Sequence, residues 1–168
     1  MDPNPLIQSP FAALTFVAAP ALLTNASSVL ALSTINRMLR TRDRMHELFI
    51  ESKGGGQTEE ERTHLMEVTD RVEKQAALLL TALHSIYLAL AAFASATLVT
   101  LLGAGVAAFH AGGWVHAMAV LGLFLGFFGA GGLVVGCAHL FRATQLSLVN
   151  IRDEAALIRK RSARPLTK

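Results

Sequence analysis

Charged side chains are absent from two long stretches of this sequence: residues 3–36 and residues 75–141 contain no Asp, Glu, Lys or Arg. As one helix rising ~1.5 Å per residue, the longer stretch would extend roughly 100 Å, whereas the hydrocarbon core of a bilayer is about 30 Å thick. We therefore predict an all-α integral membrane protein with three transmembrane helices, at residues 10–35, 76–102 and 115–140. They form one membrane domain over residues 1–168, because this length leaves no room for a separate soluble domain.

Cysteine is nearly absent as well, and Cys137, as the only one, excludes an intramolecular disulfide and a cysteine-based metal cage. The predicted spans lack the charged residues that a proton relay needs. Histidine does not replace them, because no two histidines are four residues apart, and the predicted depths of His84 and His139 differ by ~10 Å. We expect no catalytic residues, no metal ligands and no cofactor, and hence no enzyme. Axial haem ligation by two histidines stays open as an alternative.

Lysine and arginine are missing from residues 1–10 and from residues 103–114, where the longer stretch is predicted to turn back. They gather instead in residues 37–74 and after residue 141. Because cytoplasmic segments retain Lys and Arg, we predict an N-terminus outside and a C-terminus inside. The net charge of +3 therefore indicates a membrane surface and not nucleic acid. We also expect the first span to be retained and not cleaved as a signal peptide, since Asp2 precedes it without any Lys or Arg.

Residues 36–75 are predicted to form a cytoplasmic antiparallel helical hairpin with its turn at residues 54–56. Three consecutive glycines break the helix there, and Thr58 with Glu61 forms a capping box that starts the next one. With the turn centred on Gly55, residues whose numbers sum to about 110 face each other across an apolar seam. The predicted register pairs Met45 with Leu65, Met38 with Val72, Arg37 with Glu73, Arg40 with Asp70, Arg44 with Glu67 and Glu47 with Arg62.

Polar side chains interrupt the first two spans at matching depth. The hairpin register, extended into the bilayer, sets Asn25 opposite Ser85 and beside His84, with Ser28 one turn away. We expect a hydrogen bond between Asn25 and His84, which contributes ~0.6–2 kcal/mol between helices in a membrane. Two interpretations stay open, a structural one and a ligand or ion pathway. Pro20 lies within the first span and predicts a kink.

The third span carries a stripe of glycines in steps of four, three, three and four, a spacing that keeps them on one helix face. Small residues let helix backbones approach closely in a bilayer. We expect this face to pack on the first two spans or on another subunit. Its members are Gly122, Gly126, Gly129, Gly132 and Gly136.

A cytoplasmic helix is predicted to continue over residues 141–162. An apolar seam at Phe141, Thr144, Leu148, Ile151, Ala155 and Ile158 predicts that it packs on the hairpin as a three-helix bundle. Basic residues from Arg159 onward form either a solvated tail or a contact with anionic lipid.

The run Pro20-Ala-Leu-Leu-Thr-Asn, followed by Asn36-Arg37, Arg40, Asp43-Arg44 and Leu48, resembles the bacterial domain-of-unknown-function 2721 family. The resemblance extends loosely over residues 141–154, and it departs at residues 75–80, which are more apolar than the family pattern. It implies a small bacterial protein with three spans, and it carries over no catalytic residue.

Two functions are compatible with this pattern. The first is a non-enzymatic scaffold or accessory subunit of a larger complex in the bacterial inner membrane, whose partners are the lipid bilayer and other membrane subunits or a second copy. The alternative is a small oligomeric transporter, channel or sensor that uses the Asn25/His84 polar cluster. A conduction path needs a continuous polar lining, which three spans provide only as an oligomer.

Overall fold

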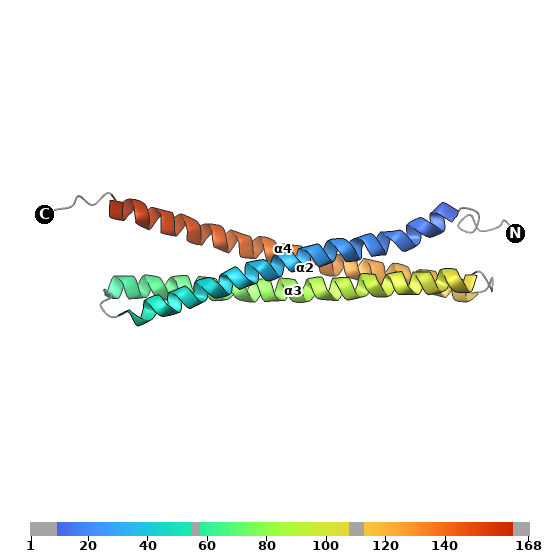
Figure 1. The fold of residues 1–168 in the computed structure, drawn as a ribbon, viewed down its shortest axis with the longest axis horizontal. Helices are drawn as coiled ribbons and strands as arrows, with labels where there is room; N and C mark the ends of the chain where they lie inside the picture. Colours follow the sequence, from blue (N-terminus) through green and yellow to red (C-terminus); the bar gives the residue numbers. More distant parts are fainter. Residues whose placement is uncertain (1–9, 55–57, 108–112, 163–168) are drawn as a thin grey trace. The chain divides into compact units, whose positions relative to one another are not determined.

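The computed structural model describes residues 10–54, 58–107 and 113–162, and all of its regular structure is helical. Three long helices follow one another along the chain: α2 at Pro10–Lys53, α3 at Glu59–Ala107 and α4 at Gly113–Ser162 (Figure 1). No strand occurs within these described ranges. The predicted all-α class is confirmed.

The helix ends follow from local hydrogen bonding. At the start of α3, the backbone N–H of Thr58 donates to Glu61 Oε2 at 3.1 Å, and the N–H of Glu61 donates to Thr58 Oγ1 at 3.3 Å. This is the predicted capping box, in which two backbone donors without helical partners are satisfied reciprocally. At the end of α2, the N–H of Gly54 donates to Glu51 O at 3.1 Å. Residues 55–57 and 108–112, which contain part of each predicted turn, lie outside the described residues.

Helix α2 continues through Pro20, which the sequence predicts to interrupt its backbone hydrogen bonding. The Thr24 hydroxyl donates to Pro20 O at 2.9 Å, and the Ser28 hydroxyl donates to Thr24 O at 2.9 Å. These hydroxyls therefore bond the backbone of their own helix.

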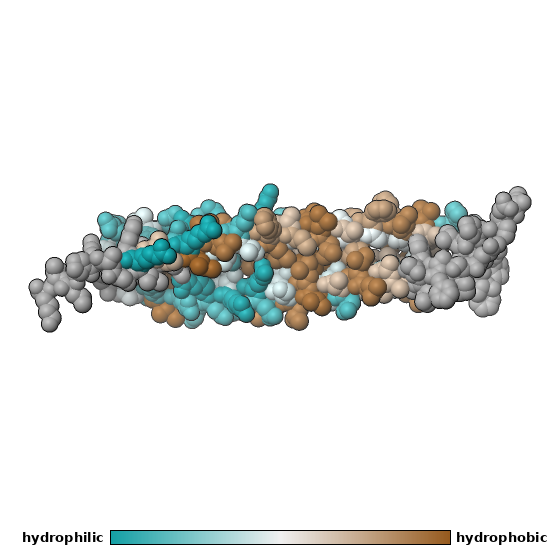
Figure 2. All heavy atoms as spheres, turned by 90° about the horizontal axis from the view of Figure 1, so that it is seen from above, coloured by the Kyte–Doolittle hydropathy of each residue, from teal (hydrophilic) through white to brown (hydrophobic). Residues whose placement is uncertain are grey.

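All three helices contain segments that are long and apolar enough to cross a membrane: Ala18–Lys53, Glu59–Val106 and Gly113–Asp153. The chain packs as two units, and each helix contributes to both. Unit 1 comprises Met1–Ser33 and Leu83–Gly136, and unit 2 comprises Thr34–Ala82 and Cys137–Lys168. In Figure 2, brown apolar side chains cover most of the visible part of unit 1, while teal hydrophilic ones predominate on unit 2.

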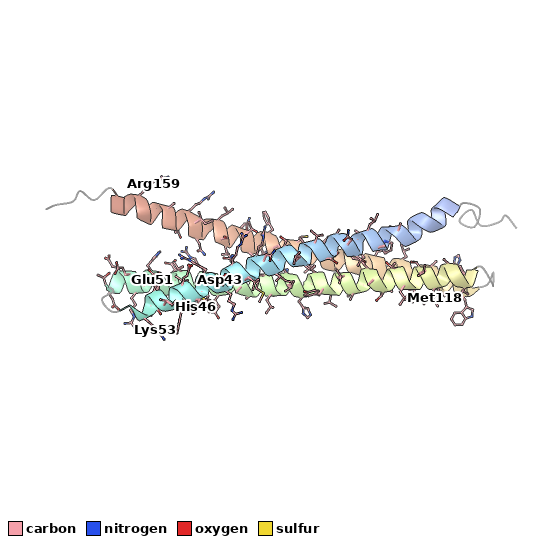
Figure 3. All side chains as sticks on the ribbon, in the orientation of Figure 1. Asp43, His46, Glu51, Lys53, Met118 and Arg159 are labelled. Atoms are coloured by element: carbon pink, nitrogen blue, oxygen red, sulfur yellow. The ribbon has the colours of Figure 1, made fainter. Side chains whose placement is uncertain are left out.

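The core of unit 1 is built around one face of α3. Ile86, Ala89, Phe93 and Ala96 are at most 1% exposed. They step by three and four residues, which places them on a single side of the helix. On the same side of α3, a Cβ built on Gly103 would lie 3.1 Å from the side-chain Cβ of Met118 of α4, so the two helices approach closely there. Met118 is labelled in Figure 3.

The core of unit 2 joins α2 and α3. Leu48 of α2 is buried with Val68 and Val72 of α3, and Met45 and Leu65 pack against this cluster. The cluster contains both members of the predicted Met45–Leu65 pair. In Figure 3, Lys53 marks the end of α2, where its ammonium lies 4.5 Å from the Phe49 ring.

Helix α4 turns a different face inward than its apolar seam predicts. Phe141, Leu148 and Ile151 are 66%, 49% and 59% exposed, whereas Ala143 is 1% exposed. Ser147 is half-buried on the same side as Ala143. Two members of the seam nevertheless face the other helices of unit 2: Thr144 accepts a hydrogen bond from Arg37 of α2, and Ile151 lines a cavity together with residues of α2 and α3. The predicted packing of that seam on the hairpin is therefore wrong for Phe141 and Leu148, whereas Thr144 does contact α2.

Candidate functional site

The hydrogen bond that is predicted to hold the polar cluster together is not present between Asn25 and His84 among the described residues. Asn25, Ser28 and His84 are exposed in unit 1, and Ser85 is half-buried. In the part of the chain that the structure describes, no hydrogen bond joins Asn25 to His84. The expected bond is absent because each side chain projects away from the packed faces of its helix, as their exposure shows.

Among the described residues that α2 contributes to unit 1, the buried polar one is Ser27. Ser27 is 0% exposed, and its hydroxyl oxygen has no hydrogen-bond partner among the described residues. It shares a helix face with Ala31, which is 5% exposed. This pair of small residues at i, i+4 spacing is the sequence pattern that could have predicted which side of α2 is packed.

Three of the five stripe glycines lie against α3 in unit 1. A Cβ at Gly122 would meet Thr100 Cγ2 at 2.8 Å, and one at Gly129 would meet Phe93 Cε1 at the same distance. At Gly132 the nearest atom is Ser85 O at 3.4 Å. Gly122 and Gly129 therefore leave no room for a methyl group unless their neighbours move. Gly136 is also buried.

Gly126 is different from the rest of the stripe, since a Cβ built there would have nothing within 4 Å. At about 100° per residue it is rotated by roughly 60° from Gly129 around the helix axis. A stripe with these steps is wider than the line along which two helices touch. The sequence spacing alone does not show which glycine falls off that line.

The hairpin charges pair within helices and toward α4, and not across the predicted register. Glu67 accepts from Arg71 and Asp70 accepts from Lys74, the latter at 2.6 Å, both at i, i+4 spacing within α3. On α2, Arg44 donates to Glu47 at 3.0 Å. The predicted pairs Arg44–Glu67, Arg40–Asp70 and Glu47–Arg62 therefore do not form among the described residues. The acids of these pairs bond instead to basic residues of their own helices, which the helix brings close without a second element.

Arg37 is likewise not paired with Glu73. It donates to Thr144 Oγ1 of α4 at 2.8 Å, and the Thr144 hydroxyl in turn donates to Leu140 O at 2.8 Å. Two helices of unit 2 are thus linked through one hydroxyl, which acts as acceptor and donor at once.

Arg71 links α3 to α4 in the same unit. It donates to Asp153 of α4 and to Glu67 of its own helix, and its side chain is 26% exposed. The hydrogen bonds to Asp153 and then to Glu67 raise the pKa of Arg71 above its ordinary value. The guanidinium therefore stays charged throughout the physiological range. Sequence reasoning missed this link, because Arg71 and Asp153 are 82 positions apart and no local pattern relates them.

The residues with metal-binding side chains are dispersed. Among the described residues, no group of three His, Cys, Asp or Glu side chains is close enough to hold a metal ion. Cys137 and His84 are exposed, and His110 lies outside the described residues.

These features define the class: an all-helical protein with three helices long and apolar enough to span a membrane. The chain belongs to the DUF2721 family, proteins of unknown function, whose family model matches residues 17–152. The family identified from the Pro20–Leu48 residues is thereby confirmed. No curated protein and no solved structure matches this chain.

Proposed function

We propose that this chain is a three-span protein of the bacterial inner membrane that acts without catalysis, as a scaffold or accessory subunit of a larger membrane complex. In this proposal residues 36–75 form a cytoplasmic hairpin, the C-terminus is cytoplasmic and the N-terminus is periplasmic. The two charge-free stretches and the placement of Lys and Arg outside them support this topology.

The exposure of Asn25 and His84 carries the proposal. Both residues lie within the charge-free stretches, and both are exposed on unit 1 without a hydrogen bond among the described residues. A polar group facing hydrocarbon without a partner is costly. A second membrane protein that offers a donor or an acceptor removes this cost and gains ~0.6–2 kcal/mol per interhelical bond. The two side chains are thus the polar anchors of a subunit interface.

The same exposure favours one alternative, a small transporter, channel or sensor assembled from copies of this chain. The buried residues of unit 1 give a single copy little polar lining, since Ser27 and Thr100 stand among alanines, Ile86 and Phe93. Conduction would therefore require several copies to place Asn25 or His84 around a shared path.

The experiment compares partners of matched variants. The full chain is extracted from its own membrane in mild detergent, and the mass of everything that travels with it is measured. We expect wild type to travel in a complex that Asn25→Leu and His84→Leu weaken. Leu22→Ala should leave it intact, because Leu22 is 69% exposed on the same helix as Asn25 but offers no polar group.

The composition of the complex separates the two functions. Different proteins in it support the accessory role, whereas copies of this chain alone support the oligomeric alternative. A monomer without companions, or a complex that neither polar substitution weakens, contradicts the proposed interface.

The topology is tested separately with reporter fusions after Pro5 and after Lys168. They should report opposite compartments, with the C-terminal reporter in the cytoplasm. Reporters on the same side of the membrane would mean that the number of spans is even.

A further inference from the structure

Unit 2 contains a cavity of about 420 Å³ between its three helices. Helix α2 contributes Arg37, Arg40 and Arg44, α3 contributes Gln75, and α4 contributes Ser147 and Asn150. The arginines step by three and four residues, so they lie along one edge of α2. The sequence predicts that this edge faces the acids of α3, whereas in the structure it lines the cavity.

Every charged residue in the lining is positive. Three guanidinium groups line the cavity, and none of its lining residues is an Asp or a Glu. Two acids of unit 2 are engaged elsewhere, since Glu47 accepts from Arg44 and Asp153 accepts from Arg71. Like charges on one helix edge repel each other. A bound anion is the simplest way to offset this repulsion.

The arginines differ in how far they are already bonded. Arg37 donates to Thr144, and Arg44 donates to Glu47. Arg40 has neither a hydrogen bond nor an ion pair among the described residues, and its side chain is exposed. A guanidinium presents five N–H donors in a planar fork that fits phosphate oxygens in pairs, so Arg40 keeps its donors for a ligand.

A second feature also points to a ligand. The Asn150 Oδ1 atom is buried, and it has no hydrogen-bond partner among the described residues. Buried polar atoms are normally bonded, and an orphaned one marks a place where a partner is missing. An amide accepts from a hydroxyl or ammonium group, or donates if its oxygen and nitrogen are exchanged. Asn150 therefore fits a polar substituent beside the anion.

We propose that this cavity binds an anionic phosphate ester, with its phosphate oxygens held by Arg37, Arg40 and Arg44 and its polar substituent by Asn150. The apolar part of the lining, Val68, Val72 and Leu79, accommodates a carbon chain next to the phosphate. Asparagine and arginine on opposite helices fix the orientation, and Arg40 contributes most to affinity because no protein group competes for it.

The ester has two possible sources, a lipid headgroup or a soluble phosphate compound. Arg37 is the first charged residue after the charge-free stretch 3–36, and Gln75 is the first residue of the stretch 75–141. With the helices inserted as proposed, both residues are at the level of the cytoplasmic headgroups, where basic pockets bind anionic lipid. This inference concerns a site separate from the Asn25/His84 interface and stands without the scaffold role.

The experiment measures ligand-induced thermal stabilisation of the purified full chain in non-ionic detergent. The ligands are short-chain phosphatidylglycerol, short-chain phosphatidylcholine and inorganic phosphate. The key variant is Arg40→Gln. Its matched control is Arg42→Gln, which removes the same charge from the same helix at an exposed residue outside the cavity lining.

We expect phosphatidylglycerol to raise the melting temperature more than phosphatidylcholine does, and Arg40→Gln to weaken its apparent Kd by about tenfold or more, as loss of a charge-assisted bond does. Arg42→Gln should bind as wild type does. Stabilisation by inorganic phosphate, lost in Arg40→Gln alone, would assign the site to a soluble compound. If no ligand stabilises the protein, or if both variants weaken binding equally, the proposal is wrong. Each variant's melting temperature without ligand shows whether it is folded.

Discussion

The Phe93 ring of α3 lies directly against the backbone of Gly129 in α4. A Cβ built on Gly129 would stand 2.8 Å from Cε1 and 2.9 Å from Cδ1 of the ring, and Phe93 is 0% exposed. Both residues belong to unit 1. The glycine thus acts as a recess for the largest fully buried side chain of the protein's described core. In a bilayer, such close van der Waals contact replaces the hydrophobic effect as the force between helices.

The first prediction compares alanine at two glycines of the same stripe. Gly129→Ala should destabilise the protein by about 1–3 kcal/mol, because its methyl group forces the Phe93 ring to move within a packed core. Gly126→Ala should change stability by at most about 1 kcal/mol, in the stabilising direction, since the site is open and alanine favours helix. Thermal unfolding in detergent measures both.

A second substitution makes this comparison specific to the ring. Phe93→Leu removes Cε1 and Cζ, two of the three ring atoms that the new methyl group would meet, so Gly129→Ala should cost less in the Phe93→Leu background than in wild type. Equal costs in both backgrounds, or equal effects of alanine at positions 126 and 129, would contradict the contact.

Sequence patterns predicted the helices of this fold better than they predicted which side of each helix packs against the others. The structure has the predicted helices in the charge-free stretches, the capping box at Thr58 and the helix start at Pro10. These features depend on residues that are neighbours in the chain. Periodicity also grouped Gly122, Gly129 and Gly132, which lie against α3, but it included Gly126, which does not. It did not show that Phe141 and Leu148 are exposed, because that depends on which polar side chains bond α4.

The predicted charge pairs failed for a related reason. A register rule assumes that a charged residue pairs across the hairpin, but Asp70 finds Lys74 and Glu67 finds Arg71 one turn away in the same helix. Local partners cost less conformational entropy to bring together. The arginine edge of α2 is left to line a cavity, a feature that no sequence spacing indicates.

The second prediction concerns the link between Arg71 and Asp153. Arg71→Gln and Asp153→Asn should each lower stability, and together they should cost less than the sum of the two single changes, since either one breaks the same bond. The contribution should shrink as salt is added, because both groups are partly exposed. The measurement is the unfolding of wild type, the two single variants and the double variant at low and high salt.

The pH dependence of that link follows from the raised pKa of Arg71. A group whose pKa is raised by folding stabilises fully below its unfolded value and loses this contribution only as pH rises through the folded value. For Arg71 both values lie above the range in which proteins are normally studied. The coupling energy should therefore be the same at pH 7 and pH 9, and a clear decrease at pH 9 would mean that another group carries it.

The third prediction tests the packing of α2 on α3 in unit 2. Met45→Cys and Leu65→Cys, in a Cys137→Ser background, should form a disulfide readily, because both side chains pack against the Leu48 cluster. Met45→Cys with Arg71→Cys is the control pair, since the predicted register separates these positions. Gel mobility after mild oxidation measures the yield. A higher yield from the control pair would contradict the antiparallel register.

The last prediction concerns the orphaned hydroxyl of Ser27. Its oxygen is buried in unit 1 without a hydrogen-bond partner among the described residues, a situation that costs about 1–3 kcal/mol. Ser27→Ala removes the hydroxyl and keeps the small volume that the site requires, so it should leave stability unchanged or raise it by up to that amount. Ser28→Ala is the matched control, because the Ser28 hydroxyl is exposed and already donates to Thr24 O of its own helix. Thermal unfolding of the two variants beside wild type decides the outcome. A loss of stability in Ser27→Ala that Ser28→Ala does not share would mean that the buried hydroxyl holds a partner, such as a bound water, and that α2 is anchored to unit 1 through it.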